Sequence, residues 1–237
     1  MDKHIDQIKI RDFYNNASEI WASDDYWHLW SRCQIEKYLH NLNIEKNDHV
    51  LNAGSGGNSY DIVCNMLHVD IASQKLSGIE NAIVSSIEKL PLNDAMFDKV
   101  ICVGSVINYC DASASISELA RVLKQNGMLI LEFENSAGYE YAGSSVYGKA
   151  ADVVTVTFQG QEHPQWLYSL PYIKSLLTAN NLVIDEVFPY QIISSLVLRL
   201  TKDETKAVRY AKFDCIARTI PFLTAHANNY IICCHKL

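Results

Sequence analysis

Two short apolar runs, each followed by residues suited to holding a nucleotide, carry the first chemical signal in this chain of 237 residues. His49–Asn52 leads directly into a glycine-rich turn that contains Gly54 and Gly56. Met66–Ile71 carries an acid, Asp70, near its end. Glycine adopts backbone angles that a Cβ forbids and lets a ligand touch the main chain. An acid after the next strand receives ribose hydroxyls in nucleotide-binding folds. The pattern therefore predicts the adenosine-binding half of an α/β nucleotide fold.

The spacing of the glycines argues against a dinucleotide. A dinucleotide site uses G-x-G-x-x-G, with a helix that starts at the turn and holds the pyrophosphate. Here Ser59 stands at the third glycine position, and residues 58–65 are all that separate the turn from the next strand. That segment leaves about one helical turn, which is a weak dipole. S-adenosylmethionine carries no phosphate and its sulfonium is a cation, so it does not need that helix. It is the cofactor that the sequence favours.

The elements that would position these residues follow in order. Ala82–Ser85 predicts a third strand, and Val100–Gly104 is typical of a central parallel strand that is buried on both faces. Apolar residues from Ile116 to Leu123 recur at helical spacing, and Asn126-Gly127 is expected to end that helix. Met128–Phe133 then reads as the next buried strand. Alternating strands and helices of this kind predict a largely parallel sheet.

These stretches resemble the class I S-adenosylmethionine-dependent methyltransferases, especially the small-molecule "type 11" branch that is similar to ubiquinone and menaquinone biosynthesis enzymes. The matching stretches, within residues 49–133, are VLNAGSGG, LHVDI, IEKLPLNDAMFDKVICVGSV and LARVLKQNGMLILEF. The tail ANNYIICCHKL looks like that family's last strand. The resemblance implies an α/β, Rossmann-like fold with a seven-stranded, mostly parallel sheet, an antiparallel last strand and an N-terminal helical lid.

The resemblance also implies a set of cofactor contacts, with two departures. Asn52 stands where the family usually has an acid, and Ser86 stands where it usually has Asp for the adenine amino group. Asn and Ser can still form hydrogen bonds, although two charges are gone. Asp70 keeps its place for the ribose. The expected contacts are Asn52, Gly54, Gly56, Asp70, Ile71, Ser86, Ile87, Val103, Gly104 and Ser105.

Three residues are candidates for catalysis: Tyr14, Tyr109 and His28. The loop after the fourth strand should lie beside the methyl group, and many relatives carry histidine where Asn108 or Tyr109 stands. A base is needed only when the attacking atom carries a proton. Tyr109 would orient the substrate, Tyr14 resembles the aromatic of the family's lid, and His28 would supply a base from that lid. Packing is an equal alternative for Tyr14, and a surface position or a satisfied polar contact is the commoner role for a lone histidine.

We expect one domain over residues 1–237, made of a lid (1–48), a cofactor-binding core (49–133) and a substrate-side half (134–237). In the last part, alternation around Gly160 and Pro164 predicts a hairpin. Glu132 and Glu134 lie in and after the strand that precedes this part. We expect them to face opposite sides of the sheet, so that at most one of them reaches the site.

Residues 191–228 are expected to be an insertion with a local surplus of positive charge. Its basic residues face only three acids, Asp203, Glu204 and Asp214; they are Arg199, Lys202, Lys206, Arg209, Lys212 and Arg218. The surplus would steer an anionic small molecule to the site. The alternative, which we favour, is a solvated helix face.

Composition limits the classes of partner. A net charge of −7 argues against a nucleic acid, because phosphate binding needs a basic surface. Seven cysteines without a C-x-x-C pair indicate a reducing, cytoplasmic setting. No apolar run approaches the roughly 18 residues of a membrane span, and the scattered histidines indicate no metal site. A small-molecule substrate remains, with the oligomeric state open.

The sequence thus predicts an enzyme that transfers methyl from S-adenosylmethionine to a small-molecule acceptor, an anionic one being an option. The alternative is a non-catalytic protein of the same fold that binds S-adenosylmethionine or a nucleoside and acts as a sensor or partner subunit. The altered positions Asn52, Ser86 and Asn108-Tyr109 motivate that alternative, since a fold alone never proves activity.

Overall fold

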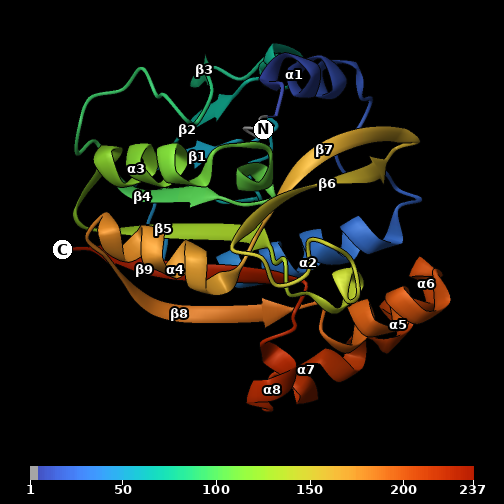
Figure 1. Ribbon diagram of the computed structural model, residues 1–237. Helices are drawn as coiled ribbons and strands as arrows, with labels where there is room; N and C mark the ends of the chain where they lie inside the picture. The colour runs from blue at the N-terminus through green and yellow to red at the C-terminus, as the bar shows by residue number, and fades with distance from the viewer. Residues whose placement is uncertain (1–4) are drawn as a thin grey trace.

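Seven strands form one mixed sheet in the computed structural model, which describes residues 5–237. Their order across the sheet is β3-β2-β1-β4-β5-β9-β8, and β9 runs opposite to the other six strands of this sheet (Figure 1). The predicted fold class is therefore confirmed. The strands are β1 (His49–Ala53), β2 (Asn65–Asp70), β3 (Ala82–Val84), β4 (Phe97–Cys102), β5 (Leu123–Glu134), β8 (Leu182–Tyr190) and β9 (Asn229–Lys236).

Helices cover the two faces of this sheet unequally (Figure 1). On one face, α3 (Ala112–Val122) and α4 (Leu170–Ala179) bury their apolar side chains in the larger core cluster. On the other face, α2 (Tyr26–His40) buries Ile35 and Leu39 in a second, smaller core cluster. Each of these helices starts at a side chain that accepts a backbone hydrogen bond, which satisfies one of the free amides of the first turn; the caps are Asp25, Asp111 and Ser169.

The expected end of α3 was wrong. The helix ends at Val122, and Leu123 already belongs to β5, where it pairs with Phe97 of β4. Asn126 does adopt a positive φ of 61°, as a helix stop would, but it lies inside the irregular start of β5. Pairing with β4 prevailed over the helical spacing because Leu123 is fully buried there.

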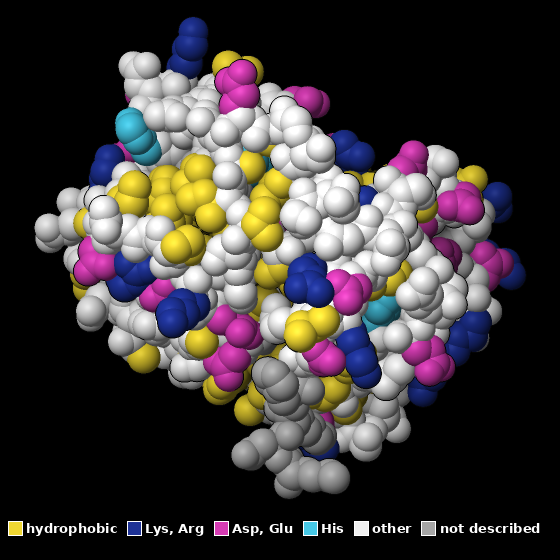
Figure 2. All heavy atoms as spheres, turned by 90° about the horizontal axis from the view of Figure 1, so that it is seen from above, with side chains coloured by type: hydrophobic (Ala, Val, Ile, Leu, Met, Phe, Trp, Pro, Cys, Tyr) yellow, Lys and Arg dark blue, Asp and Glu magenta, His cyan; other side chains and the backbone are white. Residues whose placement is uncertain are grey.

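The connection between β1 and β2 contains turns and no helix. The single helical turn allowed by the sequence does not form, and Tyr60 and Asp61 both have positive φ. Between β2 and β3 the chain makes only the short 3₁₀ helix η1 (Ser73–Leu76). Val63 and Val84 are exposed in this region. Seen from above this edge, apolar side chains gather in one area of the surface (Figure 2).

The remaining elements surround the carboxyl edge of the sheet. They are α1 (Gln7–Asn16), the 3₁₀ helices η2 (Val106–Tyr109), η3 (Tyr139–Tyr141) and η4 (Ala211–Phe213), and the hairpin of β6 (Ala151–Phe158) and β7 (Gln161–Tyr168). The segment between β8 and β9 is helical, with α5 (Ile193–Thr201), α6 (Glu204–Tyr210), α7 (Asp214–Ala217) and α8 (Pro221–Thr224). Among residues 5–237, no helix combines the length and the apolar character that a membrane span needs. The division into lid, core and substrate half stays a prediction, and the first four residues of the expected lid lie outside the described residues.

Candidate active site

Two adjoining hollows lie at the carboxyl ends of the parallel strands, the usual ligand position in such folds. The first, of about 710 Å³ with its opening, is bounded by α1 and by the residues that follow β1, β2 and β4. The second, of about 930 Å³ with its opening, lies between α2, the ends of β4 and β5, the β6–β7 hairpin and the helices after β8. The sheet topology thus places both at one edge.

The glycine turn after β1 forms one wall of the first hollow. Gly54 has φ of +75°, and a Cβ on it would lie 2.2 Å from Val106 Cγ1. Gly56 has φ of +53°, and its Cβ would lie 2.1 Å from Ile20 Cδ1. The positive φ favours glycine at both positions, and at Gly54 the three close Val106 atoms also leave no room for a Cβ. Beneath the turn, buried Asn52 donates to the carbonyl of Asn58 at 2.7 Å.

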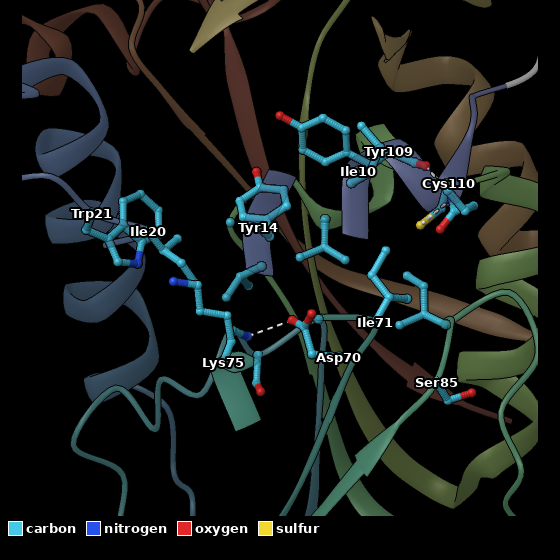
Figure 3. Close-up of a pocket in the computed structure, with 18 of the residues that line it drawn as sticks. Ile10, Tyr14, Ile20, Trp21, Asp70, Ile71, Lys75, Ser85, Tyr109 and Cys110 are labelled. Carbon is cyan, nitrogen blue, oxygen red and sulfur yellow. Dashed lines mark hydrogen bonds between the residues drawn. The ribbon is translucent and has the colours of Figure 1, made fainter. Parts of the chain in front are cut away.

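Asp70 stands at the end of β2 and faces the first hollow, across from the Tyr14 and Tyr109 rings (Figure 3). Its Oδ2 accepts from the Gly56 amide at 2.7 Å, and its Oδ1 accepts from Ala72 at 2.8 Å. Burial raises the pKa of Asp70, against those hydrogen bonds. Each carboxylate oxygen has two lone pairs, so the group can still accept from a ligand.

The ten expected cofactor contacts fall into three groups: residues that line the first hollow, one residue that lines the second, and two that line neither. Those that line the first hollow are Gly54, Gly56, Asp70, Ile71, Ile87, Val103 and Gly104. Ser105 lines the second hollow. Asn52 and Ser86 are outside the lining of both, and the Ser86 hydroxyl accepts from the Glu88 amide at 3.2 Å. The neighbouring Ser85 lines the first hollow instead.

Five residues line both hollows and form the junction between them: Tyr14, Ile20, Trp21, Gly104 and Tyr109. The Tyr14 and Tyr109 rings meet edge to face, with centroids 5.9 Å apart. Burial raises the pKa of Tyr14 to about 12 and that of Tyr109 well above its usual value. Both phenols are therefore neutral near pH 7, where they can donate hydrogen bonds but do not act as bases.

His28, the third candidate for catalysis, lines the second hollow. Its Nδ1 lies 2.7 Å and 2.8 Å from the two carboxylate oxygens of Asp25. Burial lowers the pKa of His28, but the hydrogen bonds and charge of Asp25 outweigh it, so the pKa is raised overall. An Asp–His pair of this kind fixes the ring's orientation and leaves Nε2 for other partners.

The expectation that only one of Glu132 and Glu134 reaches the site was wrong. Side chains alternate along a strand, so residues two apart share a face, and both glutamates line the second hollow. Glu132 is fully buried, and burial raises its pKa. Asn108, where many relatives have histidine, is also fully buried and donates to the carbonyls of Glu134 and Trp166. Asn108 therefore has a structural role, since its side chain links the backbones of β5 and β7.

Sequence reasoning missed several residues of the second hollow. Glu140, Gln165 and Glu204 come from η3, β7 and α6, three elements far apart in the chain. Trp21, which precedes α2, also belongs to the junction. Among the described residues, no group of three or more His, Cys, Asp or Glu side chains is arranged to hold a metal ion.

Comparison with known proteins agrees with this geometry. Residues 51–131 match the model of a family described as "Methyltransferase domain". This part of the chain thus resembles a methyltransferase domain. An uncharacterized protein of Methanocaldococcus jannaschii is 26% identical over 138 residues, covering 56% of this chain and 54% of that protein. The chain thus spans about half the length of the curated relative that it matches.

Two solved methyltransferases share the fold. The Streptomyces coelicolor geranyl diphosphate C-methyltransferase, in complex with Mg²⁺, geranyl diphosphate and S-adenosylhomocysteine, is 11% identical with a TM-score of 0.62, covering 98% of both chains. The Burkholderia thailandensis 1,6-didemethyltoxoflavin-N1-methyltransferase, with its substrate and S-adenosylhomocysteine bound, is 12% identical with a TM-score of 0.56, covering 97% of this chain and 88% of that one. At such identities the likeness concerns the fold.

The first hollow of the methyltransferase domain fits S-adenosylmethionine. It offers a backbone cradle that a Cβ would fill at Gly54 and Gly56, and a carboxylate at Asp70. Ile71 and Ile87 add apolar wall suited to a flat purine. Trp21, Tyr14 and Tyr109 stand at the junction, where aromatic rings can stabilise a sulfonium cation.

Proposed function

We propose that this protein transfers a methyl group from S-adenosylmethionine to a small-molecule acceptor that binds in the second hollow. The observation that carries the proposal is the junction, because five residues line both hollows at once. Two ligands held on either side of it would meet there. Holding two reactants in contact supplies much of the rate enhancement of a bimolecular reaction.

Residues of the first hollow would hold the cofactor. The Gly54 and Gly56 backbone would lie against it, Asp70 would accept from the ribose hydroxyls, and Ile71 and Ile87 would contact the adenine. S-adenosylmethionine supplies a methyl group on a positively charged sulfur, which is an excellent leaving group. Transfer forms a bond between the acceptor atom and the methyl carbon and breaks the carbon–sulfur bond, whose electron pair stays on sulfur.

The chain's own side chains would align the acceptor and exclude water. Tyr14 and Tyr109 are neutral donors at the junction, which Trp21 also lines. His28 would take a proton where the attacking atom carries one, because the Asp25 carboxylate stabilises the protonated ring and raises its pKa. Asp25 would act as the positioning residue for that ring.

The basic segment gives little support to an anionic acceptor. None of Arg199, Lys202, Lys206, Arg209, Lys212 and Arg218 is among the residues that line either hollow. Arg218 donates to Pro189 and Gln34, and its guanidinium lies 4.1 Å from the centre of the Phe188 ring. Changing Arg209 and Lys212 to Glu should leave the KM of the true acceptor unchanged. A raised KM in this variant would instead support the hypothesis that the acceptor is anionic.

Calorimetric titration with S-adenosylmethionine, S-adenosylhomocysteine and NAD tests the proposal first. Micromolar binding of both sulfur ligands, with none for NAD, is the expected result. If neither sulfur ligand binds, the proposal fails. Binding without turnover of any acceptor pool would favour the non-catalytic sensor, which the altered Asn52 and Ser86 positions motivate.

A further inference from the structure

The second hollow is strongly acidic. Four glutamates line it, Glu132, Glu134, Glu140 and Glu204, and within the described chain no Lys or Arg does. His28 is the remaining group there that can carry positive charge, and it already lies 2.7 Å from a carboxylate oxygen of Asp25. The hollow therefore presents an excess of negative charge to whatever enters it, although acidic residues alone do not define a ligand.

The partners of these carboxylates show which charge is still unbalanced. Glu132 receives four neutral donors and is satisfied, from Gly104, Ser105, Tyr190 and Asn229. Glu134 accepts from the neutral Tyr141 hydroxyl and the neutral Gln165 amide, each at 2.7 Å. Glu140 accepts from the Asn228 amide at 3.1 Å. Neither Glu134 nor Glu140 forms an ion pair with a Lys, Arg or His side chain among the described residues, although the charges of His28 and Lys202 lower the pKa of Glu140.

Burial raises the pKa of Glu140 to about 7, and the Glu134 charge adds to the rise. A carboxylate removed from water without a cation is costly, and a positively charged ligand would offset that cost. The acid pair Glu134 and Glu140 is thus stabilised by the arrival of a cation and destabilised by the arrival of an anion.

A second observation also calls for a hydrogen-bond donor. Asn228 lines the same hollow, is only 2% exposed, and its Oδ1 has no hydrogen-bond partner among the described residues. Buried acceptors are almost always paired in folded proteins. This oxygen is itself enclosed, beside Gly138. If the Asn228 side chain turned toward the hollow, a ligand with N–H or O–H groups would pair with the oxygen, and a fully ionised carboxylate or phosphate would not.

Aromatic side chains complete the lining. Trp27, Phe158 and Tyr190 belong to the hollow, in addition to the rings of the junction. Aromatic faces attract organic cations, and they also pack against flat apolar groups. Carboxylates beside aromatic rings are the combination that recognises an ammonium or amidinium group on an apolar body.

We propose that the methyl acceptor is an organic cation with N–H donors, an amine or amidine on a flat apolar body, that binds with its charge toward Glu134 and Glu140. This inference rests on the proposed function, since it assigns the occupant of the acceptor hollow. It also reverses the expected charge of the acceptor: the acidic hollow, and not the basic segment, selects the substrate.

Three probes of matched shape test the charge preference on protein saturated with S-adenosylhomocysteine. They are tyramine, the neutral 2-(4-hydroxyphenyl)ethanol and the anionic 4-hydroxyphenylacetate, titrated at about pH 8, above the Glu140 pKa of about 7. We expect tyramine to bind at least about tenfold more tightly than the neutral probe, and the anion to bind most weakly.

The double variant Glu134→Gln/Glu140→Gln keeps the shape of the hollow and removes both charges. It should bind tyramine no better than the neutral probe, with unchanged affinity for S-adenosylhomocysteine and an unchanged circular dichroism spectrum. Glu162→Gln removes an exposed carboxylate of β7 outside the hollow and should leave tyramine binding as it is.

Equal binding of the three probes, tighter binding of the anion, or no binding of any of them at about 10 mM would overturn the inference. So would full tyramine affinity in the double variant. These results leave the proposed function standing whenever S-adenosylhomocysteine binds. Loss of S-adenosylhomocysteine binding would instead remove the proposed function, and the probe series on the unliganded protein would still decide the charge preference of the hollow.

Discussion

The Glu132 carboxylate accepts a hydrogen bond from the backbone amide of Ser105 at 2.6 Å, and the same oxygen accepts from Gly104 at 2.9 Å. Its other oxygen accepts from Tyr190 and Asn229. Gly104 and Ser105 both have positive φ, a conformation that costs energy for a residue with a Cβ such as Ser105. A buried acid of β5 thus holds the strained turn after β4 in place, and that turn forms part of the junction.

Replacement of Glu132 by Gln should destabilise the protein by about 1–3 kcal/mol, because a buried amide NH₂ would then face donors in place of an acceptor. The turn would also loosen, so the affinity for S-adenosylhomocysteine should fall. Urea unfolding and calorimetry measure the two effects. Glu162→Gln is the matched control, and equal behaviour of both variants would show that the buried acid does not hold the turn.

Asp70→Ala should weaken S-adenosylmethionine binding at least about tenfold, because charge-assisted hydrogen bonds are the stronger kind. The variant also frees the Gly56 and Ala72 amides, which Asp70 accepts from in the folded chain. Circular dichroism should show that the fold persists, and calorimetry gives the affinity. Glu80→Ala, an exposed acid of the same region, serves as control; unchanged affinity in Asp70→Ala would remove the ribose assignment.

Gly56→Ala and Gly78→Ala form a matched pair. Both residues have positive φ, so each alanine costs about 1–2 kcal/mol in backbone strain. A Cβ at Gly78 meets nothing within 4 Å, whereas a Cβ at Gly56 would lie 2.1 Å from Ile20 Cδ1. Gly56→Ala should therefore lose more stability and bind S-adenosylhomocysteine more weakly.

Adding Ile20→Ala to Gly56→Ala should recover part of the loss, since it removes the clashing atom. Chemical unfolding of the single and double variants measures this coupling. Equal losses of stability in Gly56→Ala and Gly78→Ala would mean that the Ile20 side chain moves aside without an energetic cost.

The Asp25–His28 pair predicts a pH dependence of stability. The folded-state pKa of His28 is raised, so its contribution is complete below the unfolded-state value of about 6.5. It is lost as the pH rises through the folded-state pKa. Asp25→Asn keeps a side-chain oxygen to cap α2 but removes the charge. The Tm difference between wild type and this variant should be larger at about pH 5.5 than at about pH 8.5.

Asp24→Asn changes the neighbouring exposed acid and should show no such trend. A constant Tm difference across the pH range for Asp25→Asn would mean that the carboxylate acts only as a helix cap.

The sequence predicts the sheet well because its strands are continuous apolar runs bounded by turn residues. β1, β2 and β4 overlap those runs. The end of α3 was missed because Leu123 fits a helix and a buried strand equally well, and only pairing with Phe97 decides between them. Local spacing does not contain that information.

Key residues of the first hollow could be predicted from the sequence, whereas most of those of the acceptor hollow could not. Gly54, Gly56 and Asp70 follow consecutive strands of a parallel sheet, so spacing alone indicates that they meet. The acceptor hollow draws Glu140, Gln165 and Glu204 from three separate elements, and no spacing links them. Residues brought together only by tertiary packing leave no periodic signal in a sequence.

β9 is the last strand to leave the ribosome, yet it lies inside the sheet. β9 lies between β5 and β8, and its Lys236 ammonium donates to the Ala120 and Leu123 carbonyls at the end of α3. Strands β1 to β5 can pair as they leave the ribosome, but β8 must wait for residues 229–236 before it gains a partner. A nascent chain paused within residues 191–228 would therefore leave β5 and β8 without the partner strand that they share, and unpaired strand edges of this kind are prone to aggregation.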